Sequence, residues 1–238
     1  MSRPRVAAFR PDDGRLADAA ETLEALGADP VPDPMLAVEP TGAEPRTDAD
    51  FAVLTSTTGA GLVADAGWTF DGDLCAIGET TAGALEDEGY TVETVPEEFS
   101  SAGLVAALNG RVDGKRVEVA RSDHGSAVLL DGLESAGAYV HETVLYRLVR
   151  PEGSGESAAL AADGELDAAL FTSPLTVEHF LDAADERGVL DGALAGLDAA
   201  TVGAIGEPTA ETAREHGISV DVVPERADFD ALAAAVLD

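Results

Sequence analysis

Short apolar runs alternate along the chain with segments in which apolar residues recur at helical spacing. The runs at 5–9, 51–54 and 74–77 predict strands. A helix is predicted over 16–26, because apolar residues recur there every three or four positions before Gly27 ends the segment. Strands that alternate with helices pair in parallel and carry helices on both faces of their sheet. The pattern therefore predicts an α/β protein.

Almost the same strand, turn and helix occurs twice in the chain. Residues 76–97 read AIGETTAGALEDEGYTVETVPE, and residues 204–225 read AIGEPTAETAREHGISVDVVPE. An Arg-x-Asp-x-Gly pattern likewise stands at 10–14 and again at 121–125. These landmarks keep the same order in both copies, which indicates an internal duplication. The first copy also predicts a strand at 91–95, after its helix.

The duplicated pattern predicts two flavodoxin-like or Rossmann-like lobes with parallel sheets. Ligands of such sheets lie beyond the carboxyl ends of the strands, where turns and helix N-termini gather. Small hydroxyl residues and glycine in these turns leave backbone N–H groups free to bind an anion such as a carboxylate, while simple capping of the next helix is the ordinary alternative. The repeated turns lie at Arg10, Ser56, Thr81, Arg121, Ser173 and Thr209.

The charge balance is strongly acidic and limits the possible partners. The chain has 46 acidic residues against 14 basic ones, for a formal net charge of −32. Nucleic acid and anionic membranes are therefore not expected as partners. Lys115 is the one lysine of the sequence. Acidic, lysine-poor composition is typical of proteins from salt-loving archaea, so we interpret the charge as a sign of a halophilic habitat, where molar salt screens self-repulsion.

Localisation and assembly are expected to be simple. No apolar run approaches the roughly 18 residues that span a bilayer, and the N-terminal residues lack the apolar stretch of a signal peptide. A cytoplasmic protein is expected. Cys75 is the single cysteine and lies in an apolar run, which favours an inert, buried thiol. No surplus apolar face is evident, so a monomer is expected.

The sequence contains no conventional catalytic or cofactor motif. Neither a phosphate-binding G-x-x-x-x-G-K-[ST] loop nor a G-x-G-x-x-G dinucleotide fingerprint occurs, and no G-x-S-x-G elbow is present. The four histidines are too dispersed to bring two to one metal ion, so neither a metal nor another cofactor is expected. Tyr146 stands out in the segment 142–151, where its phenol could donate a hydrogen bond to a leaving oxygen or could equally pack a hinge.

Taken in order, several soft motifs of the chain resemble the uroporphyrinogen-III synthase family. They are an Arg-Pro turn at residue 10, a Thr-Ser turn at residue 55, the repeated Ala-Ile-Gly-x-x-Thr-Ala, Val-Leu-Tyr-Arg at 144–147 and Phe-Thr-Ser-Pro at 171–174. The resemblance covers essentially the whole chain. Two positions depart from the family pattern: the turn at 55–58 lacks a usual proline, and residue 126 is serine where relatives often carry arginine.

This resemblance implies a domain organisation in which two connectors, near 33–40 and 142–151, cross between the lobes. One lobe would comprise residues 1–36 and 152–238, and the other residues 39–149. Such enzymes cyclise hydroxymethylbilane, a linear tetrapyrrole with eight carboxylates, to uroporphyrinogen III. Loss of the terminal hydroxyl gives an azafulvene cation, attack at the substituted carbon of the last ring gives a spiro intermediate, and fragmentation with reclosure inverts that ring. No cofactor or metal is needed.

A wide interlobe cleft lined by helix-end donors would suit such a flexible polycarboxylate, and the main task would be to position the chain. By resemblance Tyr146 would assist departure of the hydroxide, and hydroxymethylbilane synthase could hand over the substrate. The candidate substrate-binding residues are Arg10, Ser56, Thr57, Gly78, Thr80, Thr81, Arg121, Ser122, Thr172, Ser173, Gly206 and Thr209. The alternative is a non-enzymatic two-lobed protein that binds a small anion, as sensor domains do.

Overall fold

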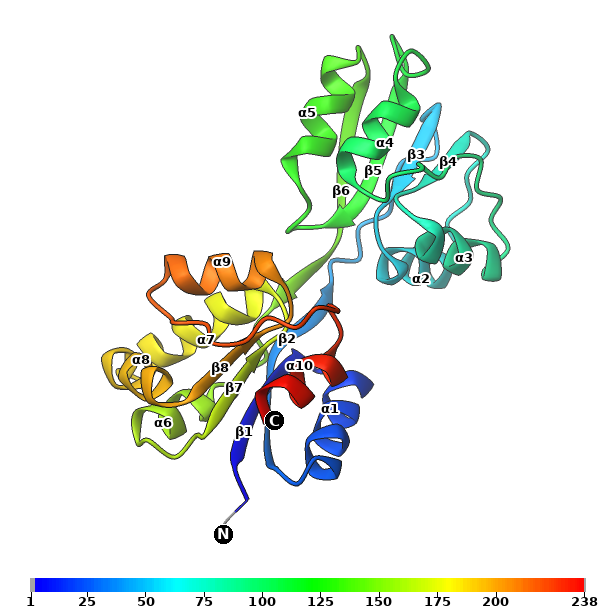
Figure 1. Ribbon diagram of the computed structural model, residues 1–238. Coiled ribbons are helices and arrows are strands. Elements are labelled where there is room, and N and C mark those ends of the chain that lie inside the picture. The colour runs from blue at the N-terminus through cyan, green and yellow to red at the C-terminus, as the bar shows by residue number, and fades with distance from the viewer. Residues whose placement is uncertain (1–2, 238) are drawn as a thin grey trace. The chain divides into compact units, whose positions relative to one another are not determined.

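The computed structural model describes residues 3–237 and divides the chain into two compact units. Unit 1 comprises Met1–Ala37 and Val149–Asp238, and unit 2 comprises Val38–Leu148. The chain leaves unit 1 within strand β2 (Asp29–Pro40) and returns to it within strand β6 (Tyr139–Val149) (Figure 1). Both connecting segments are therefore strands.

Unit 1 contains a parallel sheet in the order β2-β1-β7-β8, with helices on both faces (Figure 1). Its other strands are β1 (Arg5–Pro11), β7 (Ala168–Phe171) and β8 (Thr201–Ala204). One face packs against α1 (Gly14–Ala25) and α10 (Phe229–Leu237). The other face packs against α6 (Glu156–Ala162), α7 (Pro174–Glu186), α8 (Leu190–Ala199) and α9 (Glu207–Glu215).

The two faces of unit 1 follow from the alternation of side chains along β1. Val6 and Ala8 point to the cluster under α1 and α10, whereas Ala7 and Phe9 point to the opposite cluster. All four are fully buried, so this central strand reads as a continuous apolar run. Phe9 stacks on Phe171 with 4.6 Å between ring centroids, which anchors the larger of the two clusters.

Unit 2 has the same architecture, with a parallel sheet in the order β4-β3-β5-β6. Its remaining strands are β3 (Phe51–Leu54), β4 (Asp73–Ala76) and β5 (Arg116–Ser122). One face packs against α2 (Thr57–Asp65) and α3 (Glu79–Asp87), and the other against α4 (Ser101–Leu108) and α5 (Ala127–Ser135). The predicted α/β fold with parallel sheets is confirmed.

One segment differs from the sequence-based expectation. The segment 91–95 is predicted as a strand, but it contributes only an isolated bridge between Cys75 and Thr94. Pro96 follows directly and has no N–H with which to extend the ladder. The segment near 33–40, which the resemblance assigns to a connector, lies within the strand β2.

The prolines of β2 are compatible with a strand because they alternate. Asp29 N donates to the carbonyl of Pro4, so the odd-numbered residues 29, 31 and 33 present their N–H groups to β1. Pro30, Pro32 and Pro34 lie at the intervening positions, where β1 requires no donor. The pairing with β1 therefore survives three prolines.

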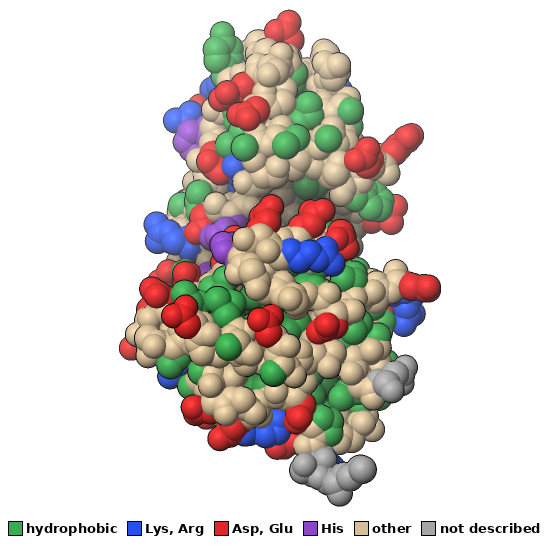
Figure 2. Space-filling view, turned by 60° about the vertical axis from the view of Figure 1, so that its left-hand side comes forward, with side chains coloured by type: hydrophobic (Ala, Val, Ile, Leu, Met, Phe, Trp, Pro, Cys, Tyr) green, Lys and Arg blue, Asp and Glu red, His purple; other side chains and the backbone are tan. Residues whose placement is uncertain are grey.

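Surface and buried positions agree with the composition. Acidic side chains are scattered over the face shown in Figure 2. Cys75 is fully buried, as expected, and this burial raises the pKa of its thiol to about 12. None of the helices within residues 3–237 combines the length and the apolar character needed to cross a membrane.

Candidate functional site

A tyrosine and a serine meet at the carboxyl edge of the unit 2 sheet. Tyr146 is 6% exposed, and its phenol Oη donates to Oγ of Ser56 over 3.0 Å. Ser56 follows β3 and caps α2, because its Oγ also accepts from Gly59 N at 3.0 Å. The two residues are 90 positions apart in sequence and are brought together by the strand order β3-β5-β6.

An irregularity in β5 and β6 turns the ring of Tyr146 inward. The register shifts between Arg121 and Ser122, so that Ser122 pairs with Tyr146 and the pairing skips Leu145. Neighbours on a regular strand point to opposite faces, yet Leu145 and Tyr146 are both buried in the cluster beneath α2. The shift thus places the phenol at the start of that helix.

Glycine begins the next helix of each unit at the repeated Ala-Ile-Gly motif. Gly78 precedes α3 with φ −170° and ψ 169°, and Gly206 precedes α9 with φ −168° and ψ 170°. Neither glycine has a side chain that could cap its helix, and an uncapped helix N-terminus is a type of site that binds anions. Thr81 and Thr209, in the first turns of these helices, are buried, at 5% and 3% exposure.

The duplicated arginines differ in their partners. Arg121, which is buried, donates from Nε to Glu142 Oε1 at 2.6 Å and from Nη1 to the carbonyl of Ser126 at 2.6 Å. In the β5–β6 register Val119 faces Glu142, and in the β1–β2 register the equivalent Ala8 faces Pro32. Unit 1 therefore has a proline, and no carboxylate, at the position equivalent to Glu142.

Arg10 is left without a partner among residues 3–237. Its Nε is buried and makes no hydrogen bond, and its guanidinium lies 5.2 Å from the ring centroid of Phe229. Burial lowers the pKa of Arg10, and the positive charge of Arg15 lowers it further. The side chain lines a pocket of about 420 Å³, whose other charged residues are Arg15, Arg226, Asp18, Asp228 and Asp230. An anion placed there would replace the lost hydration of Arg10.

The remaining candidate residues have local roles or are exposed. Thr172 donates its hydroxyl to the carbonyl of Phe9, and Ser173 forms a capping box with Thr176 at the start of α7. Thr57 and Thr80 are exposed in the first turns of α2 and α3, and Ser122 is half-buried at the end of β5. The ordinary capping alternative therefore accounts for the hydroxyl of Ser173.

The structure thus brings together some of the candidates and separates others. Within unit 2 it joins Tyr146, Ser56 and Ser122. Sequence reasoning missed Glu142 as the partner of Arg121, and it missed Phe229 and Arg226 beside Arg10. Glu142 could have been suggested from the sequence, because oppositely charged residues often pair across neighbouring strands. That suggestion needs the register of β5 and β6, which the sequence alone does not give.

Comparison with known proteins gives concordant results. A family model described as Uroporphyrinogen-III synthase HemD matches residues 17–234. A protein of Methanothermobacter thermautotrophicus named "Putative uroporphyrinogen-III synthase" is 32% identical over 97% of this chain and 96% of its own length. The uroporphyrinogen-III synthase of Chlorobaculum parvum is 26% identical over 68% of this chain and 65% of its own length.

Solved structures show a similar fold. The uroporphyrinogen-III synthetase of Helicobacter pylori has a TM-score of 0.66 at 16% identity and covers 99% of this chain and 98% of its own. A mutant uroporphyrinogen III synthase of Thermus thermophilus has a TM-score of 0.65 at 20% identity and covers 98% of this chain and 96% of its own.

Proposed function

The chain belongs to the uroporphyrinogen-III synthase family, an enzyme family of tetrapyrrole biosynthesis, and we propose that it closes hydroxymethylbilane through residues at the carboxyl edges of its two sheets. The alternative of a non-enzymatic anion sensor is not supported by this family membership. The observation that carries the assignment of roles is the hydrogen bond between Tyr146 and Ser56 at the end of the unit 2 sheet.

Tyr146 is the proposed proton donor to the departing hydroxyl of the substrate. When the C–O bond of the terminal hydroxymethyl group breaks, the oxygen takes the phenolic proton and leaves as water, and the ring system becomes an azafulvene cation. Burial of Tyr146 holds the phenol in one place, and Ser56 Oγ fixes its direction. Ser56 can be displaced as acceptor by the substrate oxygen, because its Oγ also accepts from Gly59 N and remains anchored.

Return of the proton closes the cycle. The last pyrrole ring loses a proton from carbon when it regains aromaticity after reclosure, and the phenolate left on Tyr146 is a base that can take it. The proposed steps therefore consume one hydroxymethylbilane and release one uroporphyrinogen III and one water. Most of the acceleration of the correct closure comes from holding the chain in the geometry that favours attack at the substituted carbon.

Carboxylate groups of the substrate are proposed to bind at two kinds of place. The first turns of α3 and α9, begun by Gly78 and Gly206, offer backbone N–H groups and the positive end of a helix dipole. Arg10 offers a guanidinium whose Nε has no hydrogen-bond partner within residues 3–237, beside the carboxylates of Asp18 and Asp230. Thr57, Thr80 and Ser122 are proposed to add hydroxyl contacts.

Replacing Arg10 with glutamine is expected to weaken substrate binding, whereas replacing Arg121 with glutamine is expected to lower the stability of the fold. Arg10→Gln should raise KM about tenfold with little change in kcat, because a charge-assisted hydrogen bond is worth about 1.5–3 kcal/mol. Arg121→Gln should instead lower Tm, because Glu142 and the carbonyl of Ser126 lose their donor. Steady-state kinetics and thermal unfolding of both variants test this, and an unchanged KM for Arg10→Gln would remove Arg10 from the substrate site.

The function is tested by the isomers of the product. Purified protein, kept folded in high salt, is coupled to the enzyme that makes hydroxymethylbilane, and the ratio of uroporphyrinogen III to uroporphyrinogen I is measured. Without catalysis the substrate closes spontaneously to isomer I. We expect isomer III to predominate, and formation of isomer I alone by the folded protein would refute the assignment.

The protein is further proposed to be a cytoplasmic monomer of a halophilic organism. A cytoplasmic monomer that receives its substrate from hydroxymethylbilane synthase would suit a substrate that cyclises spontaneously on release. The large exposed hydrophobic residues are scattered among different elements, as in Val38, Phe99, Val128 and Tyr139, which supports the monomer. The acidic composition supports a halophilic habitat.

A further inference from the structure

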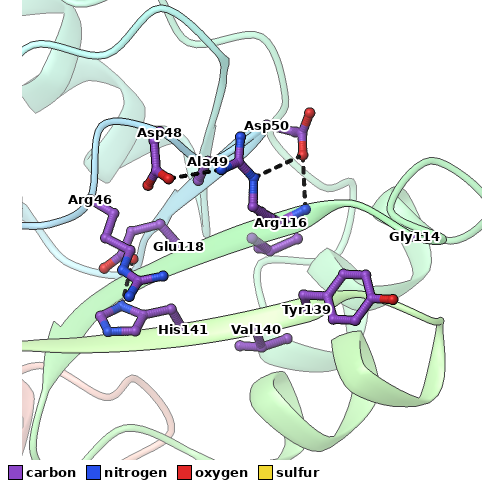
Figure 3. Close-up of a pocket in the computed structure, with 11 residues that line it drawn as sticks. Arg46, Asp48, Ala49, Asp50, Gly114, Arg116, Glu118, Tyr139, Val140 and His141 are labelled. Atoms are coloured by element: carbon purple, nitrogen blue, oxygen red, sulfur yellow. Dashed lines mark hydrogen bonds and ion pairs between the residues drawn. The ribbon is translucent and has the colours of Figure 1, made fainter.

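A pocket of unit 2 lies at the amino end of β5 and β6, opposite the sheet edge that carries Tyr146 and Ser56. It has a volume of about 470 Å³ and is lined by the strands and by the segment 46–50, which precedes β3 (Figure 3). Glu118 of β5 and His141 of β6 pair across the two strands at its base, and Arg46 reaches over them (Figure 3). None of these residues belongs to the carboxyl edge that carries Tyr146 and Ser56.

Only one oxygen of the Glu118 carboxylate has a hydrogen-bond partner within the described residues. Its side chain is 0% exposed, and Oε2 lies 2.7 Å from Nδ1 of His141. Oε1 is buried and has no hydrogen-bond partner within the described residues. A buried polar oxygen left unpaired costs about 1–3 kcal/mol, so Oε1 would be stabilised by a hydrogen-bond donor. The missing partner of Oε1 must be a hydrogen-bond donor.

The duplication shows that the fold does not require the polar pair. Glu118 and His141 occupy the register position that Ala7 and Val31 occupy in β1 and β2 of unit 1. There Ala7 is fully buried in the cluster formed with α6 and α8. In unit 2 the corresponding position instead faces the pocket beside the segment 46–50. The equivalent strand pair thus contributes to an apolar core in unit 1 and places a glutamate and a histidine at the base of a pocket in unit 2.

Glu118 is the carboxylate of the pocket that has no arginine or lysine partner within the described residues. The other two lining carboxylates are paired, Asp48 with Arg116 and Asp50 with Lys115 and Arg116. Arg116 is occupied, because Nη1 donates to Asp48 at 2.7 Å and its backbone N donates to Asp50 at 2.9 Å. Arg46 is exposed and lies on a segment without regular structure, so its side chain can move aside.

We propose that this pocket binds a small molecule carrying a primary ammonium group, which donates a hydrogen bond to Oε1 of Glu118 in place of the covering Arg46 side chain. The hydrogen bond from His141 to the other oxygen holds the carboxylate in position for this contact. The site is independent of the tetrapyrrole chemistry proposed above and stands or falls separately from it.

Methylammonium and 1,4-diaminobutane are the probes, and tetramethylammonium, which has the charge but no N–H donor, is the matched control. At constant ionic strength the two probes should raise Tm in a saturable manner and shift the Hε1 resonance of His141, whereas tetramethylammonium should do neither. Equal effects of all three cations would overturn the proposal, because they would show charge screening alone.

Two variants make the test specific to the pocket. Glu118→Ala with His141→Val installs the pair that unit 1 already uses, so the protein should fold, retain its synthase activity and lose the saturable response to the ammonium probes. Arg46→Ala should strengthen that response several-fold by removing the competing cation. If Arg46→Ala instead lowers Tm and abolishes the response, Arg46 is itself the partner of Glu118 and the proposal is wrong.

Discussion

Replacing Tyr146 with phenylalanine is expected to lower kcat for uroporphyrinogen III formation at least about tenfold while the protein stays folded. Positioned proton donors contribute about 10²–10⁴-fold, and the minimum loss is set below that range, at about tenfold, because the substrate also ionises spontaneously. The variant keeps the ring that packs beside Leu145 and loses only the hydroxyl that donates to Ser56 at 3.0 Å. The spontaneous closure is untouched, so the share of isomer I should rise.

The measurement is the initial rate and the isomer ratio at saturating substrate, with Tm determined in parallel. Tyr139→Phe is the control, because Tyr139 is 70% exposed at the amino end of β6 and should leave the rate unchanged. Ser56→Ala should have a smaller effect than Tyr146→Phe, since the phenol keeps its proton and loses only its orienting acceptor. A wild-type rate for Tyr146→Phe would make the tyrosine a packing residue of the β6 segment.

The architecture was predictable because the same pattern of strand and helix segments occurs twice in the sequence. Alternating strand and helix segments require parallel sheets covered on both faces, and both units have this arrangement. The near-identical motifs at residues 76 and 204 adopt near-identical backbones, as the dihedral angles of Gly78 and Gly206 show. Equal sequence produced equal local structure because glycine, small residues and helix formers recur in register.

Which segments pair as strands at the edges of the two sheets was less predictable from the residue pattern of each segment. Residues 91–95 have the composition of a strand but gain only one bridge, to Cys75, because the next residue is a proline. Conversely, β2 has three prolines within its pairing with β1 and still pairs, because each of them stands where β1 needs no donor. Both outcomes depend on which neighbour the strand meets, and that information is not local to the segment.

The candidate site was predictable as a set of turns but not as a set of contacts. The end of its strand marked Ser56, and the segment 142–151 marked Tyr146. Their hydrogen bond follows only from the order β3-β5-β6 and the register shift at Arg121. Arg10 and Arg121 share one sequence pattern, yet Glu142 neutralises Arg121 while Pro32 stands at the equivalent place in unit 1. The expectation that the turns of both units serve one cleft stays a prediction.

Replacing Gly196 with alanine is expected to destabilise unit 1 by about 3 kcal/mol, the cost of overpacking a tight contact. A Cβ at this position of α8 would lie 1.8 Å from the carbonyl oxygen of Ala161 in α6. That obstacle is the backbone of a helix and not the flexible end of a side chain, so α8 must move away from α6. The move would separate Leu197 and Ala161, which are buried in the same cluster beneath the unit 1 sheet.

Gly83→Ala in α3 is the matched control, because an added Cβ there meets nothing within 4 Å. Alanine is about 1 kcal/mol better than glycine inside a helix, so the control should be slightly more stable than the wild type. Thermal unfolding should therefore shift in opposite directions, with Tm lowered by roughly 6–12 °C for Gly196→Ala. If both variants gained stability, α6 and α8 would have room to separate, and the close approach of their backbones would not be what holds that face of unit 1 together.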